Sequence, residues 1–183
     1  MTKGKNYSGN NIGQRRKHDA YDTPKSMILQ LLENIELDPS KSVLDPCCAN
    51  DAMGCVLSEV FKDTVKYDLF IGEDNKSFFE ESKRYDYIIT NPPFSKWNDF
   101  VLHAKKIARK KVCFLGKIDF LTGIERYNQS VYSGLESIYI FTRKPNLAED
   151  FYDSGMRYKC GIDGYAWYVW DKLYIGEPII RWI

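Results

Sequence analysis

The segment with the clearest chemical potential is Asn91-Pro92-Pro93-Phe94, which follows the apolar run Tyr87–Thr90. Asn91 offers a side-chain amide oxygen that can accept a hydrogen bond from an amino group. The prolines lack a backbone N–H and stiffen the turn, and Phe94 adds a flat apolar face. Acceptors beside a ring suit an exocyclic amino group on a planar base taken out of its stack. Asn and Pro are also ordinary turn residues, so the tetrapeptide alone leaves both interpretations open.

Two segments upstream add context to this turn. Ser42–Ala49 reads as a short apolar strand that ends in Asp45, Pro46 and small residues, and Tyr21-Asp22-Thr23-Pro24 precedes a helical stretch. In this order the three segments resemble the amino-methyltransferases that use S-adenosylmethionine, above all the N6-adenine DNA methyltransferases. The resemblance is to the compact forms found in phages and mobile elements, and it covers the chain from about Asp19 to the final strand.

The resemblance implies that Asn91, Pro92, Pro93 and Phe94 form the catalytic motif. The Asn91 side chain and the Pro92 carbonyl would accept hydrogen bonds from adenine N6, which localises the nitrogen lone pair toward the methyl donor. Phe94 would stack on the flipped base. Positioning and electrostatics then supply the rate gain without a covalent enzyme intermediate. Asn in the first position suits adenine N6, whereas Ser is commoner there for cytosine N4.

The resemblance also implies a binding site for S-adenosylmethionine. Asp45 would hold the methionine amino group. Asp68 lies at about the spacing where an acid binds ribose hydroxyls, although it could equally be a solvated turn residue, and Asp74 is a weaker candidate for the adenine amino group. The expected cofactor-binding residues are Tyr21, Thr23, Pro24, Asp45, Pro46, Cys47, Ala49, Asp51, Asp68 and Asp74.

The cofactor loop departs from the family pattern at two positions. The family usually has Gly where this chain has Ala49 and Asp51, and glycine permits a positive φ and a close backbone approach. Ala is a small steric loss, and Asp tolerates left-handed conformations better than most residues. The departure keeps open a non-catalytic nucleic-acid-binding module. Methyl transfer to an RNA adenine or guanine, or to a protein glutamine, is a further alternative.

The elements that must position these residues alternate between strands and helices. The expected helices are a first one capped by Thr23 with Pro24 at its first position, a second around Val56–Phe61, Asp99–Lys110 and Ile118–Tyr132. The expected strands are Ser42–Leu44, Val65–Phe70, Tyr85–Thr90, Lys111–Leu115, Ser137–Phe141, Tyr165–Trp170 and Ile179–Ile183. This alternation predicts an α/β fold with a doubly wound, mostly parallel sheet. The family resemblance implies a class I methyltransferase sheet of seven strands, in which the last two segments form an antiparallel hairpin.

The length of 183 residues predicts a single domain over 19–183, preceded by a flexible basic arm over 1–18, and the resemblance implies that this domain is a methyltransferase domain. The net charge is only +1, so the arm is the main candidate for phosphate contacts, unless it is simply a solvated terminus. Nucleic acid is the expected partner, with DNA favoured over RNA, and nothing indicates the oligomeric state.

Other classes of function lack a sequence signal. Five cysteines without a Cys-x-x-Cys pair, together with two histidines, predict neither a disulfide framework nor a metal site. No apolar run is long enough to span a membrane, and the polar start is not typical of a signal peptide. We therefore expect a cytoplasmic protein.

Overall fold

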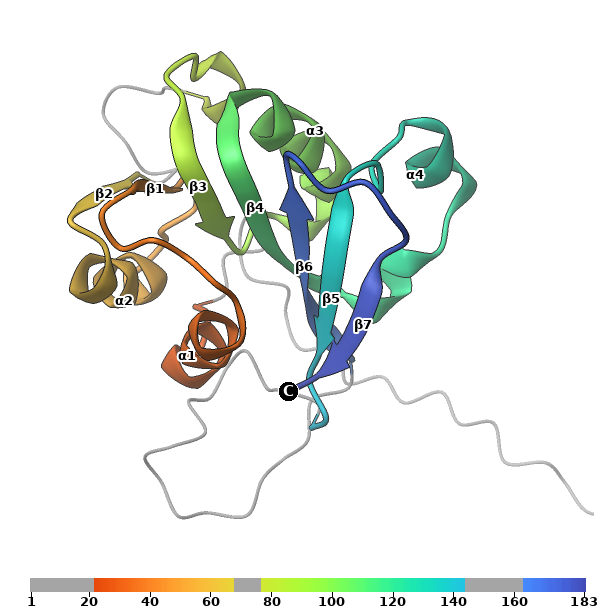
Figure 1. Cartoon of the computed structure of the whole chain (residues 1–183), viewed down its shortest axis with the longest axis horizontal. Coiled ribbons are helices and arrows are strands. Elements are labelled where there is room, and N and C mark those ends of the chain that lie inside the picture. Colours follow the sequence, from red (N-terminus) through yellow and green to blue (C-terminus); the bar gives the residue numbers. More distant parts are fainter. Residues whose placement is uncertain (1–21, 68–76, 144–162) are drawn as a thin grey trace, which may run out of the picture.

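The computed structural model describes residues 22–67, 77–143 and 163–183. Their core is one sheet of seven strands in the order β2-β1-β3-β4-β6-β5-β7 (Figure 1). The strands are β1 (Ser42–Asp45), β2 (Asp63–Lys66), β3 (Tyr85–Thr90), β4 (Ala108–Lys117), β5 (Leu135–Ile140), β6 (Tyr165–Asp171) and β7 (Ile179–Trp182). The helices are α1 (Lys25–Asn34), α2 (Ala52–Val60), α3 (Trp97–Ile107) and α4 (Ile124–Asn128), with short 3-10 turns η2 (Phe78–Glu80), η3 (Phe94–Lys96) and η4 (Ile118–Leu121).

The sheet is mostly parallel, as predicted. β2, β1, β3 and β4 run parallel to one another, and β7 runs parallel to β5. β6 is antiparallel to both β4 and β5. The antiparallel hairpin of the sheet is therefore formed by the consecutive strands β5 and β6. The two tail segments do not pair with each other. β6 is buried at every position except its last and needs a neighbour on each side, whereas the exposed β7 adds to the outer edge of β5.

The buried side chains form two clusters, one on each face of the sheet. Helices α1 and α2 cover one face and α3 covers the other, as Figure 1 shows. Successive strand residues alternate between the clusters, so Val43 faces α1 and α2 while Leu44 faces α3. Trp167 anchors α1, because its indole N–H donates to the Met27 carbonyl at 2.9 Å. The alternation explains why the strands read as almost continuous apolar runs.

Three predicted helix features are wrong. Ile118–Tyr132 is not one helix but η4 followed by the short α4, because Gly123 between them has φ 122°. Thr23 is not the cap of α1; Pro24 occupies that position and its carbonyl accepts from the Met27 N–H at 2.9 Å. The helix expected to reach Lys110 ends at Ile107, where β4 begins.

The basic residues after Ile107 therefore lie on β4 rather than at the end of α3. The Lys111 ammonium bridges the carboxylates of Glu136 and Asp171, at 2.6 and 2.7 Å. The second strand also differs from its expected bounds, since it begins at Asp63 instead of Val65. The basic arm over 1–18, the site candidates Tyr21, Asp68 and Asp74, and the end of the predicted strand Val65–Phe70 lie outside the described residues.

Candidate active site

The carboxyl ends of β1 and β3 are joined by a buried hydrogen bond. The Asp45 side chain is fully buried, and its Oδ1 accepts from the Thr90 hydroxyl at 2.6 Å and from the Cys47 N–H at 3.1 Å. Thr90 is the last residue of β3 and immediately precedes Asn91. One carboxylate thus connects the start of the expected cofactor loop to the start of the expected catalytic turn.

The loop after β1 takes the backbone conformation for which glycine would be the usual residue. Ala49 has φ 41° and Asp51 has φ 68°, so both positions where the family has Gly are left-handed here. Asp51 then caps α2 with its backbone, since the Cys55 N–H donates to the Asp51 carbonyl at 2.9 Å. The loop also lies beside the residue that follows β2, because the Cys48 N–H donates to the Tyr67 carbonyl at 3.3 Å.

Asp51 is held in this conformation by neighbours on two elements. Its carboxylate forms an ion pair with the ammonium of Lys66 at the end of β2, which raises the pKa of Lys66. Gly54 on the first turn of α2 makes room for the pair. A Cβ atom at Gly54 would lie 2.2 Å from Asp51 Oδ1 and 2.7 Å from Lys66 Cδ. The chain therefore accommodates an Asp at a glycine position through contacts from β2 and α2.

The segment before α1 reaches the same loop. Asp22 accepts a hydrogen bond from the Asn50 side-chain amide at 2.9 Å, and Thr23 is 4% exposed. Within the described residues, Oδ1 of Asp22 and Oδ1 of Asp51 are buried atoms that accept no hydrogen bond. Acceptors of this kind on both sides of the loop fit a ligand that carries amino or ammonium groups.

The turn after β3 is stiff and partly covered. Pro92 and Pro93 are buried, and the Pro93 carbonyl accepts from the Lys96 N–H at 3.0 Å, which starts η3. Phe94 is half-buried, and its ring contacts Tyr165 at 5.8 Å and Phe120 at 5.7 Å between centroids. The expected stacking face thus belongs to an aromatic group assembled from η3, η4 and β6.

A cation lies at the edge of this aromatic group. The Lys117 ammonium, at the end of β4, is 5.9 Å from the Phe94 ring centroid and 2.6 Å from the carboxylate of Asp163. The Tyr168 hydroxyl donates to the Lys117 carbonyl at 2.7 Å. The rim of the turn therefore carries both an aromatic surface and a paired charge.

The structure brings together the expected residues Thr23, Pro24, Asp45, Pro46, Cys47, Ala49, Asp51 and Asn91–Phe94 at one edge of the sheet. Sequence reasoning missed Thr90, Lys66 and Lys117. Thr90 carried a usable signal, because a polar residue that closes a buried strand must find a hydrogen-bond partner. Lys66 and Lys117 gave none, since their partners Asp51 and Asp163 lie 15 and 46 residues away.

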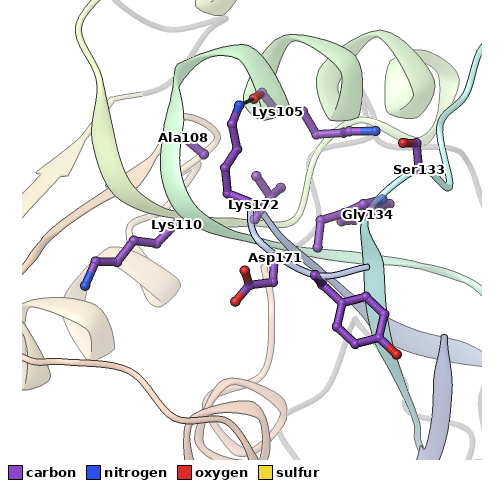
Figure 2. A pocket seen from close by; sticks show the side chains of 10 residues that line it. Lys105, Ala108, Lys110, Ser133, Gly134, Asp171 and Lys172 are labelled. Carbon is purple, nitrogen blue, oxygen red and sulfur yellow. Dashed lines mark hydrogen bonds between the residues drawn. The ribbon is translucent and has the colours of Figure 1, made fainter. Parts of the chain in front are cut away.

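A separate pocket of about 210 Å³ lies at the opposite end of β4, next to the last turn of α3 and the turn after β6 (Figure 2). Lys105, Lys110 and Lys172 lie on its rim. Burial and the neighbouring Lys172 lower the pKa of Lys105. The Lys105 ammonium donates to the Ser130 carbonyl and that of Lys172 to the Lys105 carbonyl, at 3.0 and 2.9 Å. The pocket is remote from the loop and the turn, and we do not assign it to the active site.

Two further features of the described residues bear on the class of protein. They contain no group of three or more His, Cys, Asp or Glu side chains placed to hold a metal ion. In the same part of the chain, no helix combines the length and apolarity required to cross a bilayer.

The fold has counterparts among solved structures. A protein from Vibrio vulnificus YJ016, assigned as a modification subunit of a type I restriction enzyme, matches with a TM-score of 0.60 and 12% identity, over 89% of this chain and 47% of its own. A protein from Listeria monocytogenes, assigned as a class I S-adenosylmethionine-dependent methyltransferase, matches with a TM-score of 0.54 and 10% identity, over 88% of this chain and 65% of its own. A protein from Pyrococcus horikoshii, assigned as an RNA methyltransferase, matches with a TM-score of 0.50 and 20% identity, over 84% of this chain and 87% of its own.

These matches define the class of fold, which is that of the class I S-adenosylmethionine-dependent methyltransferases. The chain spans about half the length of the modification subunit that it matches. No protein-family profile matches the sequence. No curated protein sequence matches it either.

Proposed function

We propose that the protein is an S-adenosylmethionine-dependent methyltransferase that acts on an exocyclic amino group, and that its substrate is adenine N6 in DNA. The observation that carries the proposal is the buried hydrogen bond between Asp45 and Thr90. It joins the acid at the end of β1 to the residue before Asn91, in the fold of class I methyltransferases. The cofactor loop and the amino-recognition turn are thereby held at adjoining strand ends, where ligands bind in α/β sheets.

The loop residues fit this cofactor. Bound S-adenosylmethionine would supply a methyl group on a positively charged sulfonium. Asp45 lies at the strand end where the methionine amino group would be held, and the buried oxygens of Asp22 and Asp51 could accept from polar N–H and O–H groups. The left-handed Ala49 and Asp51 let the backbone turn closely around a ligand.

The turn residues would then act on the target base. The Asn91 amide oxygen and the Pro92 carbonyl accept from the amino group and hold its nitrogen lone pair toward the methyl donor. Phe94 orients the base, and its contacts with Phe120 and Tyr165 keep the ring in place. No group of the protein needs to form a covalent bond, so the rate gain comes from positioning and from the oriented acceptors.

The test is methyl transfer from labelled S-adenosylmethionine to adenine-containing DNA, with Asn91→Ala as the main variant. We expect turnover to fall by about 10²-fold or more, as when one oriented polar group is removed from an active site, while S-adenosylhomocysteine still binds. Asn128→Ala, at the exposed end of α4, is the matched control and should keep full activity. Equal turnover of Asn91→Ala and wild type would refute the role of the turn.

An RNA base is the second candidate substrate. The match to the Pyrococcus horikoshii protein assigned as an RNA methyltransferase, over 87% of its length, favours this alternative. DNA and RNA strands of the same sequence separate the two substrates, and control strands with inosine in place of adenosine lack the amino group that would accept the methyl. Methylation of the RNA strand alone would replace DNA by RNA in the proposal.

A further inference from the structure

In the part of the chain that the structure describes, the outer edge of the sheet carries a run of exposed apolar side chains. β7 is exposed at all four positions, with Ile179 and Ile180 each 47% and Trp182 68% exposed. Leu173 and Ile175, in the connection from β6 to β7, are also exposed. Within the described residues no element lies beyond β7, as Figure 1 shows at the edge next to β5. An exposed apolar edge promotes strand pairing with another chain, even where the edge strand is as short as β7.

The backbone of β7 has one side available for such pairing. The Ile183 N–H donates to the Ile140 carbonyl, and the Ile183 carbonyl accepts from the Thr142 N–H, at 2.9 and 2.8 Å. Ile183 therefore directs both of its backbone groups toward β5. Because successive residues of a strand direct these groups to alternate sides, Ile180 and Trp182 direct theirs outward, away from β5.

We infer that β7 pairs with β7 of a second copy of this chain, antiparallel and about a two-fold axis at Ile180. The two sheets then become one continuous sheet across an isologous interface. At the axis, the outward N–H and C=O groups of Ile180 exchange hydrogen bonds with those of the partner's Ile180. The N–H of Trp182 is opposite the carbonyl of the partner's Pro178, whose missing N–H falls at the end of the pairing.

The residue types select this register over its neighbours. An axis at Ile179 would place Ile180 opposite the partner's Pro178, which has no N–H to donate. An axis at Arg181 would place two arginines directly opposite each other, which is unfavourable. The axis at Ile180 leaves Pro178 at the end of the pairing and places no two arginines directly opposite each other.

Charge complementarity supports a second copy as the occupant. Glu177 and Arg181 are exposed, and they lie on the same face of the strand because they are four residues apart. In the inferred register, Glu177 is the diagonal neighbour of the partner's Arg181, within reach of a long side chain. The two-fold axis repeats this pair, and Ile179 lies opposite the aliphatic stem of the partner's Arg181. A strand with this arrangement is complementary to itself.

Sedimentation velocity of the full chain from about 1 to 100 μM tests the inference. We expect a concentration-dependent dimer that Ile180→Lys converts to a monomer. Glu177→Arg and Arg181→Glu should each weaken dimerisation roughly tenfold, because each replaces two attractive pairs by repulsive ones. The double variant should restore the dimer, which a purely apolar contact would not require.

Ile124→Lys, on α4 and 72% exposed in the wild type, is the matched control and should leave the dimer unchanged. A monomer at every concentration would overturn the inference. A dimer that survives Ile180→Lys, or one that Ile124→Lys weakens equally, would also overturn it. Sedimentation does not depend on methyl transfer, so its result tests the dimer independently of the proposed function.

Discussion

Replacing Gly54 by Ala tests whether Asp51 is held as the structure describes. Gly54 lies in the first turn of α2, where Ala is normally the better helix former by roughly 0.5–1 kcal/mol. Here, however, the added Cβ atom would lie 2.2 Å from Asp51 Oδ1. The carboxylate must then leave its position, and the ion pair with Lys66 is lost.

The two effects have opposite signs and similar sizes. The Asp51 and Lys66 side chains are each 36% exposed, so solvent screening keeps the ion pair weak. Gly54→Ala alone should therefore change the free energy of unfolding by less than about 0.5 kcal/mol. In an Asp51→Gly background the obstructing carboxylate is absent, and the same substitution should stabilise the protein by roughly 0.5–1 kcal/mol. The expected coupling is about 0.5–1 kcal/mol.

Urea denaturation of the wild type, both single variants and the double variant closes this thermodynamic cycle. Titration with S-adenosylhomocysteine in parallel reports the loop itself, and Gly54→Ala should weaken binding because Asp51 is displaced. Equal stabilisation by Gly54→Ala in both backgrounds would refute the contact between Gly54 and Asp51.

Three further predictions concern the strands. Thr90→Val removes the donor to buried Asp45 and should cost about 1–3 kcal/mol of unfolding free energy, with weaker cofactor binding by calorimetry. Trp167→Phe removes the indole donor to the carbonyl of α1 and should cost about 1 kcal/mol in urea melts. Burial opposes the charged forms of Lys111 and Asp171, but their mutual hydrogen bond raises the pKa of Lys111 and lowers that of Asp171. The Asp171 contribution should be present above about pH 4 and lost as the pH falls through its lower folded pKa, and the Lys111 contribution should be present below about pH 10 and lost above its raised folded pKa. The difference in urea midpoint between wild type and Lys111→Met should thus shrink at both extremes, and a constant difference would contradict this.

Local patterns were sufficient to predict most elements of the sheet. The bounds of β3 agree with the expectation residue for residue, because its apolar run ends abruptly at Asn91 and the prolines. The expected helix over Ile118–Tyr132 failed because its apolar spacing hid the break at Gly123. The position of β6 between β4 and β5 depends on packing against distant strands, which periodicity does not report.

The expected site residues were named from a family resemblance, and their placement could be predicted only where they lie next to a recognisable strand end, as Asp45 and Asn91 do. Their roles remain predictions. The hydrogen bonds that hold these residues in place could not be predicted from the sequence. The bond from Thr90 to Asp45 spans 45 residues and that from Asn50 to Asp22 spans 28, so both depend on the completed sheet.

The geometry of the cofactor loop bears on whether the chain is a working methyltransferase or a binding module with a degenerate loop. A left-handed conformation costs a non-glycine residue roughly 1–2 kcal/mol, and the loop holds both Ala49 and Asp51 in it. Relaxation of either residue to negative φ would remove that cost, so other contacts must favour the turn. Lys66 and the space above Gly54 provide such contacts for Asp51. Because Ala49 and Asp51 both hold the left-handed conformation that glycine readily adopts, the sequence departure at these positions is compatible with the proposed cofactor site. Absence of S-adenosylhomocysteine binding in a folded wild-type protein would reverse this conclusion.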